Sequence, residues 1–232
     1  MNAAETKERK VAWAMLILCP LSMMIVCAIV TMGYGRGLLY HPLGYLQATC
    51  ILWAIIMMVL PILRLARKIA LPYWFMALLY ADMYMFVLSL CHGMYFEPLL
   101  YGDMLWWGDF THVISGMVVA SIVFMALCLM ESRSPKHVTL GGRGGIAVMV
   151  FIIGCAFGAI WEMMEGFTDI ISNFDYMSYG GIYTLYDLAA DAIGAFIMAV
   201  IAFIILSKHD ARHVASDIRL GKKNIDIRSD GA

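Results

Sequence analysis

Residues Trp107–Met130 read WGDFTHVISGMVVASIVFMALCLM, an apolar run that opens with an acid and a histidine and then carries no charge. A helix needs about 20 apolar residues to cross the roughly 30 Å hydrocarbon core of a bilayer, and this run is long enough. Five further runs approach or reach that length. The six predicted spans are Val11–Met32, Leu46–Leu63, Pro72–His92, Trp107–Met130, Ile146–Glu165 and Tyr186–Leu206.

The composition of the whole chain agrees with these runs. Hydrophobic residues make up 62% of the 232 residues and charged residues 14%. Soluble domains are nearer half apolar and a quarter charged, so the composition indicates a protein in lipid. We therefore predict an all-α membrane protein with one six-transmembrane-helix bundle at residues 11–206. A cytoplasmic N-terminus at 1–10 and a flexible cytoplasmic tail at 207–232 complete the predicted chain.

Lysine and arginine are distributed unevenly between the loops. Fifteen of the sixteen lie before the first run, after the second, after the fourth or in the tail, and Arg36 is the exception. Cytoplasmic loops of membrane proteins carry this excess of basic residues. The pattern predicts a multi-pass protein of the plasma (inner) membrane with both termini in the cytoplasm, which requires an even number of spans.

Ionisable residues enter three of the predicted spans, where such residues are costly and usually functional. The fourth span opens with Asp109 and His112, three residues apart, and the sixth opens with Asp187 and Asp191, four residues apart. The end of the fifth span carries a third group, which comprises Glu162, Glu165 and Asp169. These spacings put each group on one helix face, and the alternating directions of the spans bring all three groups to one extracytoplasmic level.

Small residues follow the same helix faces. Gly154 and Gly158 precede Glu162 at four-residue intervals, and Gly194 follows Ala190 at the same interval. Stripes of small residues with this spacing let helices approach closely in lipid. We therefore expect these three spans to pack together with their acids turned inward.

Six carboxylates and one imidazole cannot share a poorly hydrated site as bare charges, so protons or cations must offset them. One or two divalent metals would do so, although carboxylate-bridged metal bundles use more than one histidine. The predicted ligands are Asp109, His112, Glu162, Glu165, Asp187 and Asp191, with Asp169 as a candidate general base. Oxygen-rich coordination with one nitrogen suits Zn, Mn or Fe and leaves Mg or Ca open. The alternative is a polar or proton-handling network without metal.

Two further residues are candidates for the same site. Asp82 lies near the middle of the third span, and an acid at the midplane is more often functional than not. His92 lies at the outer end of that span, where marking the membrane interface is the simpler explanation.

At the motifs of the last three spans the chain resembles the YjdF-type inner-membrane family and, more distantly, the VanZ-like membrane proteins. The shared pattern is Asp-x-x-His at the start of one helix, Glu-x-x-Glu at the end of the next, and Asp-x-x-x-Asp-x-x-Gly at the start of the last. Here these motifs are Asp109/His112, Glu162/Glu165 and Asp187/Asp191/Gly194. The likeness covers about the C-terminal half, and it implies a role in the cell envelope rather than a particular reaction.

The leading hypothesis is a metal-dependent membrane enzyme that acts on a lipid or lipid-linked envelope substrate from the outer leaflet. A bound cation would make its water acidic enough to supply hydroxide near neutral pH, for attack on an ester, amide or phosphoester. Two rivals stay open: a small proton- or cation-coupled transporter, which Asp82 favours, and a non-catalytic envelope-binding protein. We expect a membrane lipid or lipid-linked molecule as partner and no nucleic acid, and the sequence leaves the oligomeric state open.

Overall fold

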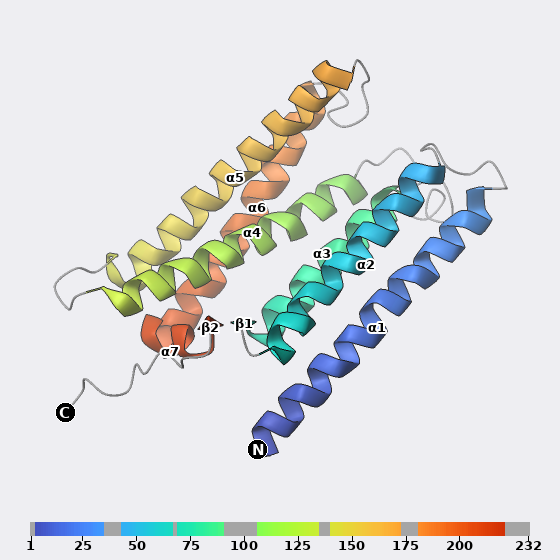
Figure 1. Ribbon diagram of the computed structural model, residues 1–232. Helices are drawn as coiled ribbons and strands as arrows, with labels where there is room; N and C mark the ends of the chain where they lie inside the picture. The colour runs from blue at the N-terminus through green and yellow to red at the C-terminus, as the bar shows by residue number, and fades with distance from the viewer. Residues whose placement is uncertain are drawn as a thin grey trace, which may run out of the picture. The chain divides into compact units, whose positions relative to one another are not determined.

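The computed structural model describes residues 3–34, 43–66, 69–90, 106–134, 140–172 and 181–220, which form two compact units. The first unit contains α1 (Ala3–Tyr34), α2 (Leu43–Leu65), β1 (Ile69–Ala70), α3 (Tyr73–Leu90) and β2 (Arg219–Leu220) (Figure 1). The second unit contains α4 (Trp106–Arg133), α5 (Gly142–Ser172), α6 (Gly181–Lys208) and α7 (Ala211–Ser216).

Among the described residues, five helices are long and apolar enough to cross a membrane. They are the stretches Arg9–Ile29, Gln47–Leu65, Gly108–Arg133, Gly142–Ile171 and Gly181–Lys208, within α1, α2, α4, α5 and α6. The predicted third span corresponds to α3, whose apolar stretch Tyr73–Val87 is shorter. The part of the chain that the structure describes is therefore an all-helical membrane protein apart from one short strand pair. That α3 also crosses the membrane, that the spans form a single membrane domain, and the side on which each terminus lies stay predictions.

Several helices extend beyond the apolar runs that predicted them. α1 begins at Ala3, α5 continues to Ser172, and α6 begins at Gly181. The reason is that hydropathy marks the part of a helix that lipid covers, whereas backbone hydrogen bonding continues until the end is capped. As a result Asp169 lies inside α5, and the spacing of the three acids on this helix is helical throughout.

The first unit packs its helices around methionine and tyrosine. α2 contacts both α1 and α3, and Met23 and Met57 are fully buried. The hydroxyl of Tyr80 donates a hydrogen bond of 2.9 Å to the carbonyl oxygen of Met57, which satisfies a polar group inside an apolar core. β1 and β2 pair antiparallel, with Ile69 opposite Leu220.

The second unit is a bundle in which α4, α5 and α6 each contact the other two (Figure 1). One half of this bundle, the apolar half, has a core made of Ala120, Phe124, Ile146, Val150, Ala195, Met198 and Ala202. At the other half, the polar half, the start of α4, the end of α5 and the start of α6 come together, because α5 runs opposite to its two neighbours. The polar half contains all the acids that the sequence singled out on these helices.

The stretch after α6, which the sequence predicts as a flexible tail, is folded as far as Leu220. The side chain of Asp210 caps α7 by accepting a hydrogen bond of 2.7 Å from the backbone N–H of His213. Val214 and Ala215 are buried, and α7 packs against α4. A helix of six residues has too little periodicity to be recognised by composition, so only its packing reveals it.

Candidate functional site

Three glycines bring the helices of the second unit into close contact in the polar half. A Cβ atom at Gly194 would lie 2.2 Å from the carbonyl oxygen of Val113, so the backbones of α6 and α4 touch there. A Cβ atom at Gly116 would lie 2.6 Å from the backbone oxygen of Asp191. On α5, a Cβ atom at Gly158 would lie 2.7 Å from Oδ2 of Asp191. The predicted small-residue stripes are therefore confirmed as helix contact faces.

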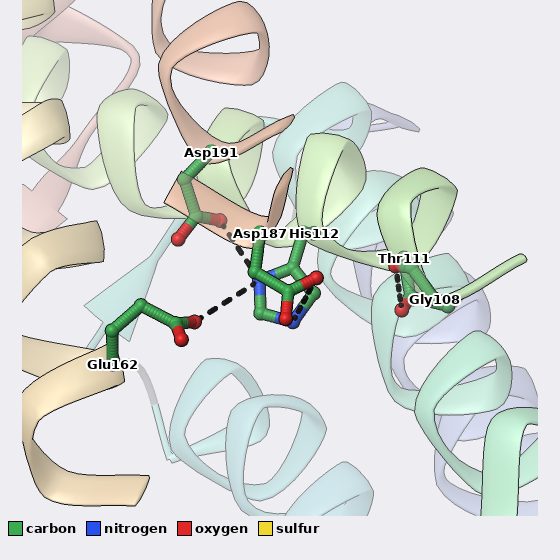
Figure 2. Close-up of polar contacts among 6 residues, drawn as sticks. All are labelled: Gly108, Thr111, His112, Glu162, Asp187 and Asp191. Atoms are coloured by element: carbon green, nitrogen blue, oxygen red, sulfur yellow. Dashed lines mark hydrogen bonds and ion pairs between the residues drawn. The ribbon is translucent and has the colours of Figure 1, made fainter. Parts of the chain in front are cut away.

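The imidazole ring of His112, in the second turn of α4, is the centre of the site (Figure 2). Its Nδ1 atom lies 3.4 Å from Oδ1 of Asp191 and 3.8 Å from Oε1 of Glu162. Its Nε2 atom lies 3.5 Å from Oδ1 of Asp187. One ring on α4 thus meets carboxylates from both α5 and α6. The two acids of α6, one turn apart, face different nitrogens of the ring.

Glu162 has the most buried side chain of these three acids, at 2% exposed. Neither of its carboxylate oxygens has a hydrogen-bond partner among the residues that the structure describes. The 3.8 Å to Nδ1 of His112 is longer than the usual 2.7–3.2 Å of an N–H···O bond. A buried carboxylate without a partner is costly, so the arrangement calls for a proton or a cation between Glu162 and its neighbours.

His112, Glu162 and Asp191 form a group that could hold a metal ion. One ligand atom from each lies within 4.8 Å of the others. Atoms that bind a tetrahedral zinc ion at about 2.1 Å are about 3.4 Å from one another. The separation of 3.4 Å between Nδ1 and Oδ1 of Asp191 equals this value, whereas the 3.8 Å to Glu162 is longer, so the side chains would have to close on a bound ion. Three protein ligands also leave a fourth position for water or substrate.

The other predicted ligands on these helices lie around this group. Glu165 is buried on the same face of α5 as Glu162, and its charge interacts with those of His112 and Asp187. Asp109 is half-buried, and its charge also interacts with that of Asp187. Both acids therefore add carboxyl groups to the polar half, outside the group of three.

Three predicted residues stand further from the ring or cannot be related to it. Asp169 is buried on α5, and its Cα lies about 10 Å along the helix from that of Glu162 at 1.5 Å per residue. Asp82 belongs to α3, in the first unit. His92 lies outside the described residues.

One residue of the site was not predicted from the sequence. The side chain of Trp161 interacts with that of Glu165, one turn further along α5. A donor and a carboxylate four residues apart on a helix were the available signal. Tryptophan at the end of a membrane helix is so common that this signal does not stand out.

A family model described as "Predicted membrane protein (DUF2238)" matches residues 18–208. The chain belongs to the DUF2238 family. The matched stretch of this DUF2238 protein starts in α1 and ends with α6, so it includes His112 and its three carboxylate partners. No curated protein matches the chain, and no solved structure does. This member of the family is a polytopic membrane protein with a buried His–Glu–Asp group.

Proposed function

We propose that the protein binds a divalent metal ion at His112, Glu162 and Asp191 and uses it to hydrolyse a lipid or lipid-linked substrate. The observation that carries the proposal is the Glu162 carboxylate, buried beside the ring and without a hydrogen-bond partner in the described chain. A cation between the three side chains offsets that charge. A carboxylate buried there for packing alone would destabilise the bundle.

The ligand atoms favour a transition metal. One imidazole nitrogen and two carboxylate oxygens suit Zn, Mn or Fe, whereas Ca prefers six to eight oxygen ligands and Mg keeps several waters. The spacing of His112 and Asp191 is that of a tetrahedral site, which supports Zn first.

The free fourth position supports hydrolysis. A water bound there would lose a proton to a nearby carboxylate and attack the carbonyl or phosphoryl group of a substrate. Glu165 lies one turn from Glu162, and Asp169 lies two turns away, so we assign the proton to Glu165 first. Asp169 would then act through Glu165 or through water rather than on the metal-bound water itself.

The surroundings of the site support a substrate that arrives from the lipid. His112 and Asp187 are 17% and 18% exposed, so the ring can be reached from outside the bundle. Large apolar side chains next to the site residues in sequence are exposed, including Phe110, Trp161 and Tyr186. We expect a lipid or a lipid-linked envelope molecule with an ester, amide or phosphoester bond near its polar end.

The orientation of the protein in the membrane and its relationship to other protein families belong to the same proposal. We propose that α3 crosses the membrane together with the five longer helices, which gives six spans. The protein would then lie in the plasma (inner) membrane with both termini in the cytoplasm. The site then opens on the extracytoplasmic side. The kinship with YjdF-type and VanZ-like proteins that the motifs suggest is part of the same proposal. A reporter fused after residue 208 should read cytoplasmic and one fused near Phe174 external.

A small cation-coupled transporter is the second candidate. It is favoured by Asp82, a half-buried acid within the apolar helix α3, which an outward-facing hydrolase does not need. The two candidates differ in how Asp82→Asn behaves. In a hydrolase this variant keeps its activity towards a detergent-solubilised substrate, whereas in a transporter it loses cation-driven uptake into vesicles.

Metal analysis of detergent-purified full-length protein tests the metal site. We expect the wild type to retain about one Zn, Mn or Fe ion per chain, as a single three-ligand site implies. Glu162→Gln should lose most of it, because the amide is a weaker ligand. Glu165→Gln is the matched control, since it makes the same change one turn away on α5. A wild type that retains no metal and takes up none on addition would refute the proposal.

A further inference from the structure

The two nitrogens of the His112 ring have unequal surroundings. Nδ1 faces two carboxylates, from Glu162 on α5 and Asp191 on α6, whereas Nε2 faces the single carboxylate of Asp187. A neutral imidazole has one N–H donor and one lone pair, and the hydrogen bond made by one nitrogen decides which form is present. An N–H bond can point directly at one acceptor only. A single acid on the Nε2 side therefore suits the proton, and two converging acids on the Nδ1 side suit a lone pair that shares a cation with them.

The burial of the three acids follows the same division. The side chains of Glu162 and Asp191 are 2% and 7% exposed, and that of Asp187 is 18% exposed. The Asp187 carboxylate therefore reaches the surface of the bundle, while the other two depend on what lies between them. Asp187 meets the Nε2 edge of the ring, whereas Glu162 and Asp191 meet the Nδ1 edge. It is therefore poorly placed to share an ion with Glu162.

We propose that Asp187 is a positioning residue, which accepts the Nε2–H of His112 and so directs the Nδ1 lone pair at the metal. This inference rests on the proposed metal site, and it revises the prediction that Asp187 is a ligand in the same way as Asp191. Histidines that bind metals usually donate their other ring N–H to such a carboxylate, which fixes the orientation of the ring. The one-turn spacing of Asp187 and Asp191 lets the two acids of α6 hold opposite sides of one imidazole.

The first measurement is the Zn²⁺ affinity of the full-length protein in detergent, by competition with a chromophoric chelator. We expect Asp187→Asn to weaken binding about 10–100-fold, the usual effect of losing such a partner. Asp191→Asn removes a ligand and should weaken binding further. Asp109→Asn is the matched control, because it removes the same charge near Asp187 from a residue outside the three partners of the ring. Size-exclusion profiles and melting temperatures check that each variant is folded.

The second measurement identifies the protonated nitrogen directly, by NMR of Zn²⁺-loaded protein with isotope-labelled histidine. The His112 signals are assigned by their loss in His112→Gln. We expect a proton on Nε2 and the metal on Nδ1 in the wild type, and a mixture of ring orientations in Asp187→Asn.

Each outcome decides a different question. A wild type that binds no Zn²⁺ would remove the proposed function, and the positioning role with it. A wild type that binds Zn²⁺ through Nε2, with the proton on Nδ1, would leave the metal site standing but make Asp187 a ligand. An Asp187→Asn protein with wild-type affinity and a wild-type NMR pattern would show that Asp187 does not orient the ring.

Discussion

The two halves of the α4–α5–α6 bundle differ most clearly along α5. In the apolar half, Ile146, Val150 and Gly154 are buried against the neighbouring helices. Between Ala159 and Ile171, in the polar half, the buried residues of the same helix are Glu162, Glu165 and Asp169. One helix thus contacts its partners through apolar surface at one end and through carboxylates at the other.

The two halves have different requirements for stability. Apolar side chains and glycines in van der Waals contact hold helices together in lipid without any ligand. Carboxylates on facing helices repel one another unless a proton or cation lies between them. We therefore expect the apolar half to be stable on its own and the polar half to depend on what it binds.

Gly194→Leu should prevent the bundle from closing. A Cβ at this position would already lie 2.2 Å from the carbonyl oxygen of Val113 and 3.0 Å from the backbone nitrogen of Met117, so backbone must move. We expect a loss above about 3 kcal/mol, beyond the usual cost of overpacking. Folded yield and melting temperature in detergent measure it. Gly166→Ala is the control, since a Cβ there meets nothing within 4 Å, and a melting temperature lowered as much by the control would contradict the packing argument.

Phe124→Ala should destabilise the apolar half independently of metal. Phe124 is fully buried, so its removal leaves a cavity. We expect the stability to fall by about 3 kcal/mol. This is the low end for such a change, because the unfolded helices remain in an apolar medium. Ile122→Ala, at a position 50% exposed, should change little. Thermal melts with and without chelator should give the same difference between Phe124→Ala and wild type. A difference that disappears on chelation would mean that the two halves are not independent.

Removing metal should destabilise the wild type through the polar half. A ligand present at 100 times its dissociation constant contributes about 2.7 kcal/mol of stability, and chelation removes that contribution. Glu162→Gln should respond less, because it binds metal weakly and has lost one of the repelling charges. Melting temperatures before and after chelator test this expectation. A wild-type melting temperature that chelator does not move would favour protons over metal in the site.

Alanine substitutions at two glycines one turn apart on α5 should separate the halves most finely. A Cβ at Gly154 would meet Ala195 Cβ at 2.8 Å, and a Cβ at Gly158 would meet Asp191 Oδ2 at 2.7 Å. Both changes should cost about 1 kcal/mol of stability. Only Gly158→Ala should also weaken Zn²⁺ binding, because the displaced group is a ligand. Equal Zn²⁺ affinities for the two variants would argue against Asp191 as a ligand.

Much of this organisation could be predicted from the sequence, because it depends on local periodicity. The spacing of Glu162, Glu165 and Asp169 requires one helix face, and all three are buried on it. The apolar runs predicted the long helices, although the helices extend beyond the runs. The largest extension is eight residues, at the start of α1, where polar residues continue the helix. α7 could not be predicted, since its stability comes from packing against α4.

The membrane class, the uneven distribution of basic residues and the helix face of each acid could be read from the sequence alone, because they follow from composition and from the fixed rise and rotation of a helix. It presented Asp187 and Asp191 as equivalent. Only the tertiary structure decided that Asp191 meets Nδ1 of His112 beside Glu162 and that Asp187 meets Nε2. The physical reason is that helical spacing limits which residues share a face, whereas the close approach of α4, α5 and α6 at their glycines decides which atoms of those faces meet.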